Sequence, residues 1–275
     1  MGLLRTSGMV LLLMALAISG CGEDASGSLS GAPGVASPEV QAGFPIYAES
    51  QLSTMIALVD GTFLDRTAIL RALAASEEVR TTQWESMRRL FTDFQQAWGD
   101  AGIYWFVLPD GNYYTVEKGL VGQSLVDREY FPRIMSGETV IGSLVISKAT
   151  GKKSAVMAVP VLNELGQVIG GVGASLFLEK LNEGLDQALS LPEGMVFYVL
   201  APNGTTTLHY NFAMIFENPL EMDSPSLKAA AEVMLATASG EVEYEYNGFQ
   251  KRVRYLASSL TQWRFAFGVN IAALG

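Results

Sequence analysis

The sequence predicts an α+β fold in which a long N-terminal helix precedes two tandem modules, each built on an antiparallel sheet. The first observation is the helical spacing of apolar residues within 41–100, where Met55, Val59 and Phe63 share one face. The second is an order of strands and glycine-containing turns that occurs in 101–190 and again in 191–275. The chain therefore divides into one helical segment and two sheet modules.

The helical segment contains no proline between Ile46 and Trp98. Its apolar positions are separated by charged ones such as Asp65 and Arg66, which is typical of an amphipathic helix packed against other elements. The pattern fits one long helix, or two helices in series with a break near Gly61 or Ser76.

The first module begins with Ile103–Leu108, an aromatic and β-branched run followed by a turn at Pro109–Gly111 and a strand from Tyr113 to Val116. The sequence predicts three further strands and a short helix, over Val140–Ser147, Ser154–Leu162, Gln167–Phe177 and Lys180–Leu189.

The second module repeats four features of the first in the same order. The paired features are Asp110-Gly111 with Asn203-Gly204, Ser136–Glu138 with Ser239–Glu241, Thr150-Gly151 with Asn247-Gly248, and Val168–Leu176 with Gln262–Val269. Four coincidences in one order indicate two copies of one antiparallel unit, each with a helix that crosses between turn and strand.

The N-terminus predicts export and a lipid anchor. Arg5 and a short apolar run precede Cys21, so residues 1–20 have the order of a signal peptide, and Ile18–Cys21 resembles the bacterial lipobox. The alternative is an ordinary signal peptide with a stray cysteine. Residues 21–40, rich in Gly, Ser, Ala and Pro, predict a flexible tether. Gly22 in place of aspartate favours the outer membrane if the cell is Gram-negative.

Composition excludes several functions. The net charge is −10, which disfavours binding to nucleic acid and anionic lipid. One cysteine and one histidine cannot build a nitrogen–sulfur zinc site, and no nucleophile motif accompanies His209. We therefore expect no catalysis, no metal and no cofactor, and we expect His209 to be a surface residue.

The first sheet module carries motifs of a known family. They are Asp127–Phe131, Ser147–Gly151, Pro160-Val161 and Gly170–Gly173. Their order resembles the Asp-Arg-x-(Trp/Tyr)-(Tyr/Phe), Thr-Gly, Pro-Val and Gly pattern of the double Cache (dCache) sensor domains of bacterial receptors. The resemblance covers about Ile46 to Val269. It implies two PAS-like modules, a membrane-distal one (101–190) and a membrane-proximal one (191–275).

The resemblance implies a small-molecule site in the distal module, with Arg128, Tyr130 and Phe131 as ligand contacts. A guanidinium binds a carboxylate through two parallel hydrogen bonds. Trp105 and Tyr114 lie on the strands expected to face this pocket. The alternatives to ligand contact are purely structural: Arg128 could form a surface ion pair with Asp127 or Glu129, and the aromatic residues could pack in the core.

Amine-binding members of the family place acidic residues where this chain has Ser147 and Ser175. A serine cannot neutralise a buried ammonium, and the neighbouring Lys148 adds a cation. The ligand expected is therefore an anion such as an organic carboxylate, not an α-amino acid. Ser147 and Lys148 join Arg128, Tyr130, Phe131, Trp105 and Tyr114 as the seven predicted ligand contacts.

The resulting hypothesis is an extracytoplasmic, lipid-anchored sensor whose bound state is read by a separate sensor kinase, chemoreceptor or transporter. The resemblance also suggests a homodimer formed through the long helix. Two alternatives stay open at this point: an interaction lipoprotein on a dCache scaffold, and a solute-binding protein that serves a transporter.

Overall fold

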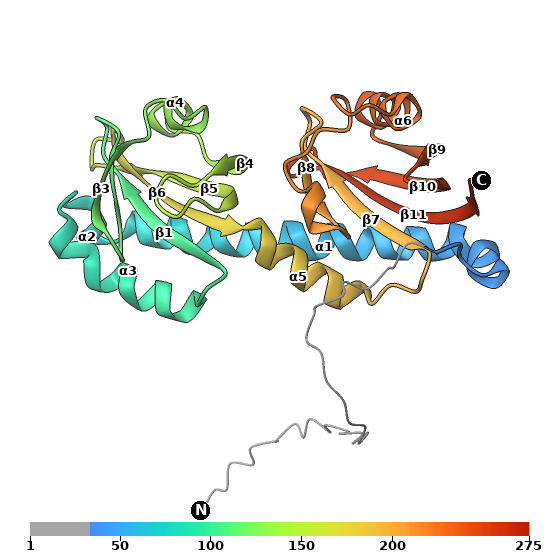
Figure 1. Ribbon diagram of the computed structural model, residues 1–275. Coiled ribbons are helices and arrows are strands. Elements are labelled where there is room, and N and C mark those ends of the chain that lie inside the picture. Colours follow the sequence, from blue (N-terminus) through green and yellow to red (C-terminus); the bar gives the residue numbers. More distant parts are fainter. Residues whose placement is uncertain (1–33, 275) are drawn as a thin grey trace, which may run out of the picture.

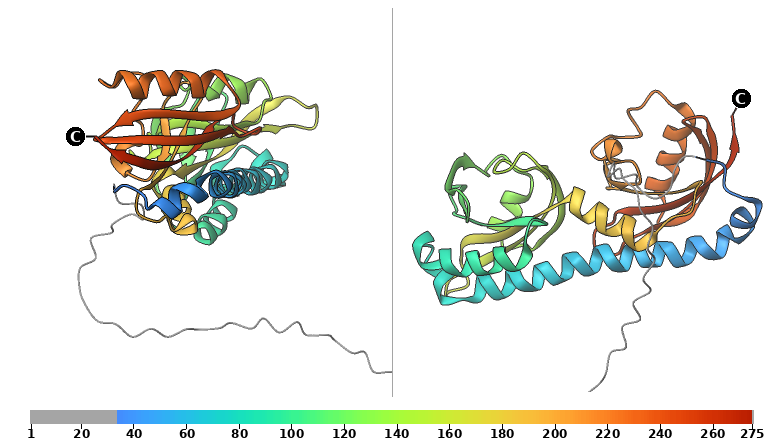
Figure 2. Two further views of the ribbon diagram at one scale, coloured as in Figure 1. Left: turned by 90° about the vertical axis from the view of Figure 1, so that its right-hand side faces the viewer. Right: turned by 60° about the horizontal axis from the view of Figure 1, so that its bottom comes forward.

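The computed structural model describes residues 34–274 and shows two antiparallel sheets side by side along one long helix, α1 (Figure 1). Helix α1 runs along one face of both sheets, while α4 and α6 cover their opposite faces (Figures 1 and 2). The α+β fold class predicted from the sequence is confirmed. The predicted signal peptide, Cys21 and residues 21–33 of the predicted tether lie outside the described residues.

The helices are α1 (Pro38–Ala75), α2 (Glu77–Arg80), α3 (Trp84–Trp98), α4 (Tyr130–Met135), α5 (Leu178–Leu189), the 3-10 helix η1 (Phe212–Met214) and α6 (Pro225–Ala236). The strands of the first sheet are β1 (Gly102–Val107), β2 (Asn112–Thr115), β3 (Gly119–Ser124), β4 (Val140–Ile146), β5 (Lys153–Leu162) and β6 (Val168–Phe177). Those of the second are β7 (Met195–Leu200), β8 (Thr206–His209), β9 (Ser239–Tyr246), β10 (Phe249–Ala257) and β11 (Arg264–Ala273).

The end of the predicted tether, residues 34–40, belongs to the folded domain. Ser37 caps α1 by accepting a hydrogen bond from the Val40 N–H, and Pro38 occupies the first helical turn, where its missing N–H costs nothing. Just before the helix, the Ala36 N–H donates to the Asn270 carbonyl of β11 at 3.0 Å. Backbone pairing and capping therefore start the ordered structure earlier than composition predicts.

The long helix ends at the second of the two expected breaks. Gly61 lies inside α1, whereas Ser76 is extended and its hydroxyl caps α2 by accepting from the Val79 N–H. Phe44 and Phe63 of α1 pack on the second sheet, with ring centroids 6.4 Å from Phe267 and 5.4 Å from Trp263 respectively.

The later part of α1 packs on β5 and β6 of the first sheet. One helix thus joins both modules. Within residues 34–274, no helix is both long enough and apolar enough to cross a membrane.

The two sheets share one topology. Their strand orders are β3-β2-β1-β6-β5-β4 and β8-β7-β11-β10-β9, so the second repeats the first apart from β3, a strand that the sequence did not predict. Trp105 of β1 lies opposite Gly173 of β6, and Tyr198 of β7 lies opposite Ala266 of β11. These two pairs occupy corresponding places in the two modules.

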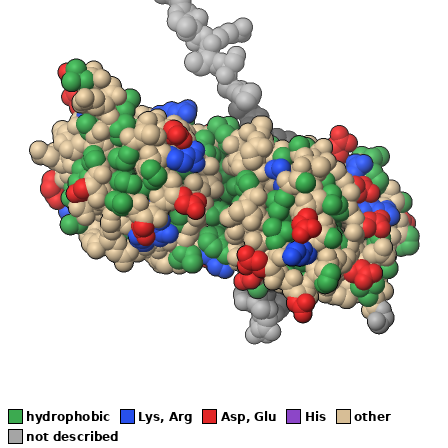
Figure 3. Space-filling model, turned by 90° about the horizontal axis from the view of Figure 1, so that it is seen from above, with side chains coloured by type: hydrophobic (Ala, Val, Ile, Leu, Met, Phe, Trp, Pro, Cys, Tyr) green, Lys and Arg blue, Asp and Glu red, His purple; other side chains and the backbone are tan. Residues whose placement is uncertain are grey.

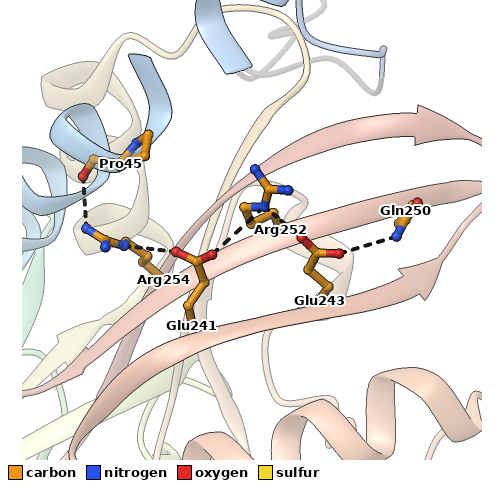
Figure 4. Close-up of polar contacts among 6 residues, drawn as sticks. All are labelled: Pro45, Glu241, Glu243, Gln250, Arg252 and Arg254. Carbon is orange, nitrogen blue, oxygen red and sulfur yellow. Dashed lines mark hydrogen bonds and ion pairs between the residues drawn. The ribbon is translucent and has the colours of Figure 1, made fainter. Parts of the chain in front are cut away.

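A row of ion pairs crosses β9 and β10 at the far edge of the proximal sheet (Figure 4). Arg252 Nε lies 2.7 Å from Glu243, and Arg254 Nε lies 3.0 Å from Glu241. Arg254 also donates to the carbonyl of Pro45 at 3.1 Å, which connects the row to the first turns of α1. These side chains are partly exposed, so each pair contributes little by itself.

Candidate functional site

A small cavity in the distal module lies between the sheet and the segment that leads into α4. Its volume is about 10 Å³, room for roughly one water molecule. It is lined by Ile103, Trp105, Tyr113, Leu125, Arg128, Tyr130, Val145, Ser147, Lys148 and Ser175. Two cationic residues and no carboxylate belong to this lining, which gives the cavity a positive character.

Trp105 belongs to the core under the sheet and lines the cavity. Its indole N–H donates to Ser175 Oγ at 3.1 Å, and its ring centroid lies 6.0 Å from that of Tyr130. A Cβ placed on Gly173 would overlap the indole ring, so only glycine allows the ring to lie across β6 at this point. Trp105 therefore sets how much room the distal cavity has.

Arg128 lies in the turn before α4 and is half-buried. Its Nη2 donates to the Ile146 carbonyl at 2.7 Å, whereas its Nε is buried and has no hydrogen-bond partner within residues 34–274. An unsatisfied buried donor on a charged group is costly. Burial raises the pKa of Tyr113 to about 12 and that of Tyr130 further, while the charge of Arg128 acts in the opposite direction on both.

Lys148 reaches the same cavity, but its charge already has a partner. Its Nζ lies 2.5 Å from Asp127 and donates to the Ser124 carbonyl at 2.6 Å. The hydrogen bond from Lys148 lowers the pKa of the exposed Asp127 carboxyl. Arg128 forms no ion pair among the described residues, although its charge also helps to lower the pKa of Asp127. Among the cations that line this cavity, it is therefore the one without a bonded carboxylate.

Five of the seven predicted ligand contacts line this cavity: Trp105, Arg128, Tyr130, Ser147 and Lys148. The other two lie elsewhere. Phe131 is 7% exposed and packs in the core under α4. Tyr114 lies on the opposite face of the sheet, where it stacks on Trp84 with ring centroids 5.4 Å apart.

Tyr113 takes the place that was predicted for Tyr114, because alternate residues of β2 face opposite sides of the sheet. Ile103, which shares the face of Trp105, also lines the cavity and was not predicted. The two-residue periodicity of the strand was the signal that could have identified it.

A second and larger cavity in the proximal module was missed altogether. Its volume is about 30 Å³, room for about two water molecules. It is lined by Val196, Tyr198, Leu200, Thr206, His209, Tyr210, Met214, Pro219, Leu227, Met234, Tyr244, Tyr246 and Lys251. The expectation of a surface histidine is wrong, since His209 is 8% exposed and β8 carries it into this interior.

Arg128 also borders a groove of about 590 Å³ between the modules, to which Asn203 and Trp263 of the proximal module contribute. On the face that carries α4 and α6, acidic and basic side chains are interspersed and no extended basic patch is visible (Figure 3). The described residues contain no group of three or more side chains placed to hold a metal ion.

The sequence matches no protein-family model and no curated protein. The fold, however, is that of the extracellular ligand-binding domains of bacterial chemoreceptors and sensor kinases. With the extracellular domain of the histidine kinase rpHK1S-Z16 the TM-score is 0.70 at 14% identity, over 84% of this chain and 96% of that one.

Two chemoreceptor domains from Pseudomonas are similar to a comparable degree. For PctB of Pseudomonas aeruginosa in complex with L-Arg, the TM-score is 0.67 at 17% identity, with 83% of this chain and 96% of that one covered. For CtaA of Pseudomonas fluorescens in complex with L-serine, the values are 0.66 and 15%, with 84% and 98% covered. At these identities the similarities show the fold alone: this chain has the fold of these extracellular domains.

Proposed function

We propose that this chain is a non-catalytic, extracytoplasmic sensor domain that binds a small anionic metabolite, of carboxylate type, at Arg128 in the distal module. The observation that carries the proposal is the buried Nε of Arg128, which lacks an acceptor at the edge of a cavity with no acidic lining. A carboxylate supplies two oxygens in the geometry that a guanidinium binds best.

The same lining argues against an amino acid. The structures of PctB and CtaA contain L-Arg and L-serine, so those domains accommodate an ammonium group. In this chain Ser147 and Ser175 line the distal cavity, and Ser175 Oγ accepts the Trp105 indole N–H. Asp127 lies nearby but is paired with Lys148. An ammonium would find no free carboxylate in the lining.

Binding requires the cavity to expand. Room for one water does not hold a carboxylate of four or more heavy atoms. The side chain that has to move is Trp105, or the turn that carries Arg128 and Tyr130 has to open. A ligand that stabilises the expanded form shifts the population toward it, and that difference in conformation is what a sensor transmits.

The proposal includes a lipid anchor and a separate membrane protein that responds to the bound state. A lipid on Cys21 holds the chain at a membrane, with Gly22 favouring the outer membrane of a Gram-negative cell, and residues 22–33 serve as the tether. A separate sensor kinase, chemoreceptor or transporter reads the bound state. Pairing of two copies through α1 is part of the same proposal.

The small size of the distal cavity favours one alternative, an interaction lipoprotein on the same fold. In that case Trp105 stays packed in the core and does not move. Arg128 then only stabilises the turn before α4, through its hydrogen bond to the Ile146 carbonyl. The proposed experiment separates this alternative from a sensor.

The experiment is thermal melting of the full chain in detergent with carboxylates, amino acids, amines and purines. A ligand at 100 times its Kd adds about 2.7 kcal/mol to the free energy of unfolding. We expect at least one carboxylate to raise Tm more in the parent chain and in Lys148→Met than in Arg128→Gln. No response to any compound would support the interaction lipoprotein, and an equal response of Arg128→Gln and the parent chain to every carboxylate would contradict the assigned contact.

A further inference from the structure

The proximal cavity contains a buried cation. Lys251 is 2% exposed, and its Nζ donates to Asn270 Oδ1 at 2.6 Å. The ammonium also lies over the rings of Tyr210 and Phe249, at 6.0 and 5.6 Å from their centroids. None of the residues that line the cavity carries a carboxylate. A buried ammonium held by a neutral oxygen and ring faces is a favourable place for an anion.

The orientation of Asn270 is fixed from behind. Its Nδ2 donates to the Gly34 carbonyl at 2.8 Å, so its Oδ1 is the atom left to face Lys251. An ammonium has three donors and Asn270 takes one of them. The donors that remain are available to a ligand in the cavity.

His209 supplies a further donor beside Lys251. Its Nδ1 accepts the Asn211 N–H at 2.8 Å, so in the neutral ring the proton resides on Nε2. Burial, together with the charge of Lys251, lowers the pKa of His209 to about 3, which keeps the ring neutral at physiological pH. Asn182 of α5 holds the backbone of His209 through two hydrogen bonds, of 2.7 and 3.0 Å.

We infer that the proximal cavity is a second ligand site, separate from the distal one, and that it takes a short-chain monocarboxylate. Lys251 binds the carboxylate, His209 Nε2–H donates to it, and the alkyl part packs against Val196 and Leu227. One cation balances one negative charge, which disfavours di- and tricarboxylates. Methionines such as Met214 and Met234 give the wall the adaptability that a ligand larger than two waters needs.

The site lies between two structural connections. On one side Lys251 is linked through Asn270 to Gly34, in the segment that enters α1. On the other side His209 is linked through Asn182 to α5, the helix that joins the two modules. A carboxylate bound between Lys251 and His209 therefore contacts both connections at once.

The test uses the only histidine of the chain as its reporter. The full chain, labelled with ¹⁵N-histidine and kept in detergent, is titrated with sodium acetate and sodium propionate near neutral pH, against sodium chloride at equal ionic strength. We expect the Nε2–H signal of His209 to shift and saturate with the carboxylates only. An equal shift with chloride, or no shift with either carboxylate, would overturn the inference.

Two variants separate this site from the distal one. Lys251→Met keeps the length of the side chain and removes the charge, and we expect at least about a tenfold loss of affinity for acetate and propionate. Arg128→Gln should leave the His209 titration unchanged, whatever it does to binding in the distal module. Unchanged affinity in Lys251→Met, with the His209 signal still present as evidence of folding, would refute the role of Lys251.

Discussion

The distal and proximal modules share one topology but differ in how they use the space between sheet and helix. At corresponding places, Trp105 lies across Gly173 and fills the distal cavity, whereas Tyr198 lies opposite Ala266. The Tyr198 hydroxyl accepts from Tyr244 at 3.2 Å, in a wall that leaves about 30 Å³ free.

The placement of charge also differs between the modules. The distal cation, Arg128, is half-buried at the edge of a groove, while the proximal cation, Lys251, is 2% exposed. Two copies of one fold thus differ in cavity volume, and the facing pairs Trp105–Gly173 and Tyr198–Ala266 are one place where they differ. The shared topology determines where a cavity can form between sheet and helix. The volume of the side chains that line it determines how much space is left.

The largest effect should come from removing the residue that fills the distal cavity. Trp105→Ala deletes a buried indole, and we expect the free energy of unfolding to fall by about 3–5 kcal/mol. Urea unfolding monitored by circular dichroism measures this loss. A loss below about 1 kcal/mol would mean that Trp105 is not a packed part of the fold.

The facing glycine provides the matched control for Trp105. Gly173→Ala places a methyl group against the same ring, so we expect overpacking to cost about 1–3 kcal/mol. The proximal module already has alanine at the corresponding place, Ala266, and Ala266→Gly should show no such overpacking. Equal stability of Gly173→Ala and the parent chain would remove the basis of the comparison.

The next effect is a dependence of the free energy of unfolding on pH, and it arises from His209 in the proximal module. In the folded chain the pKa of His209 is lowered from 6.5 to about 3, because the ring is buried near Lys251. As the pH falls from 6.5 toward 3, the unfolded chain takes up a proton on this ring and the folded chain does not. Stability is therefore lost across this window, by roughly 2–4 kcal/mol.

His209→Asn should remove this part of the acid dependence. The measurement is the free energy of unfolding of both proteins between pH 7 and pH 4, and only the difference in slope is compared, because the substitution also changes packing. Parallel curves would show that His209 is not kept neutral by its burial.

These two regions also show what the sequence could and could not predict. The long helix, the tandem modules and most strands followed from periodicity and from glycine turns, which depend on nearby residues. Two motifs of the distal module, Asp127–Phe131 and Ser147–Gly151, pointed to four residues that line one cavity: Arg128, Tyr130, Ser147 and Lys148. The register of β2 was ambiguous between Tyr113 and Tyr114, because both neighbours are aromatic and the pattern does not show which face each takes.

The proximal cavity could not be predicted in the same way. In the sequence, Lys251 looks like an ordinary surface lysine beside Arg252. Its burial depends on the hydrogen bond to Asn270, which lies nineteen residues later. His209 reads as a chance histidine, and its burial depends on Asn182 of α5, twenty-seven residues earlier. Single-sequence patterns do not report such long-range pairings, although the alternation Lys251, Val253, Tyr255 was a signal that these three share one face.

Lys251 should also make the free energy of unfolding depend on pH, in this case in the alkaline range. Burial lowers the pKa of Lys251 from 10.5 to about 8. Between pH 8 and pH 10.5 the unfolded chain holds more protons on this lysine than the folded chain does, so stability rises with pH, by about 1–3 kcal/mol. Lys251→Met should lack this rise.

The measurement for Lys251 is urea unfolding at pH 7.5, 8.5 and 9.5. Staying below pH 10 limits the contribution of the tyrosines, whose usual pKa is about 10. A rise of the same size in both proteins would show that the ammonium is solvated in the folded state and would weaken the case for the proximal site.

The smallest effect concerns the ion-pair row of Figure 4. The distal sheet lacks such a row, because the corresponding pairs are Leu144 with Ala155 and Ile141 with Met157. We expect a coupling free energy of about 0.2–1 kcal/mol between Glu243 and Arg252, because both are partly exposed. A double-mutant cycle with Glu243→Gln and Arg252→Gln measures it, and 1 M NaCl should reduce it. A coupling that stays constant in high salt would indicate that the row is shielded from solvent. That result would point to a second surface covering this edge of the proximal module, as pairing of two chains near the start of α1 requires.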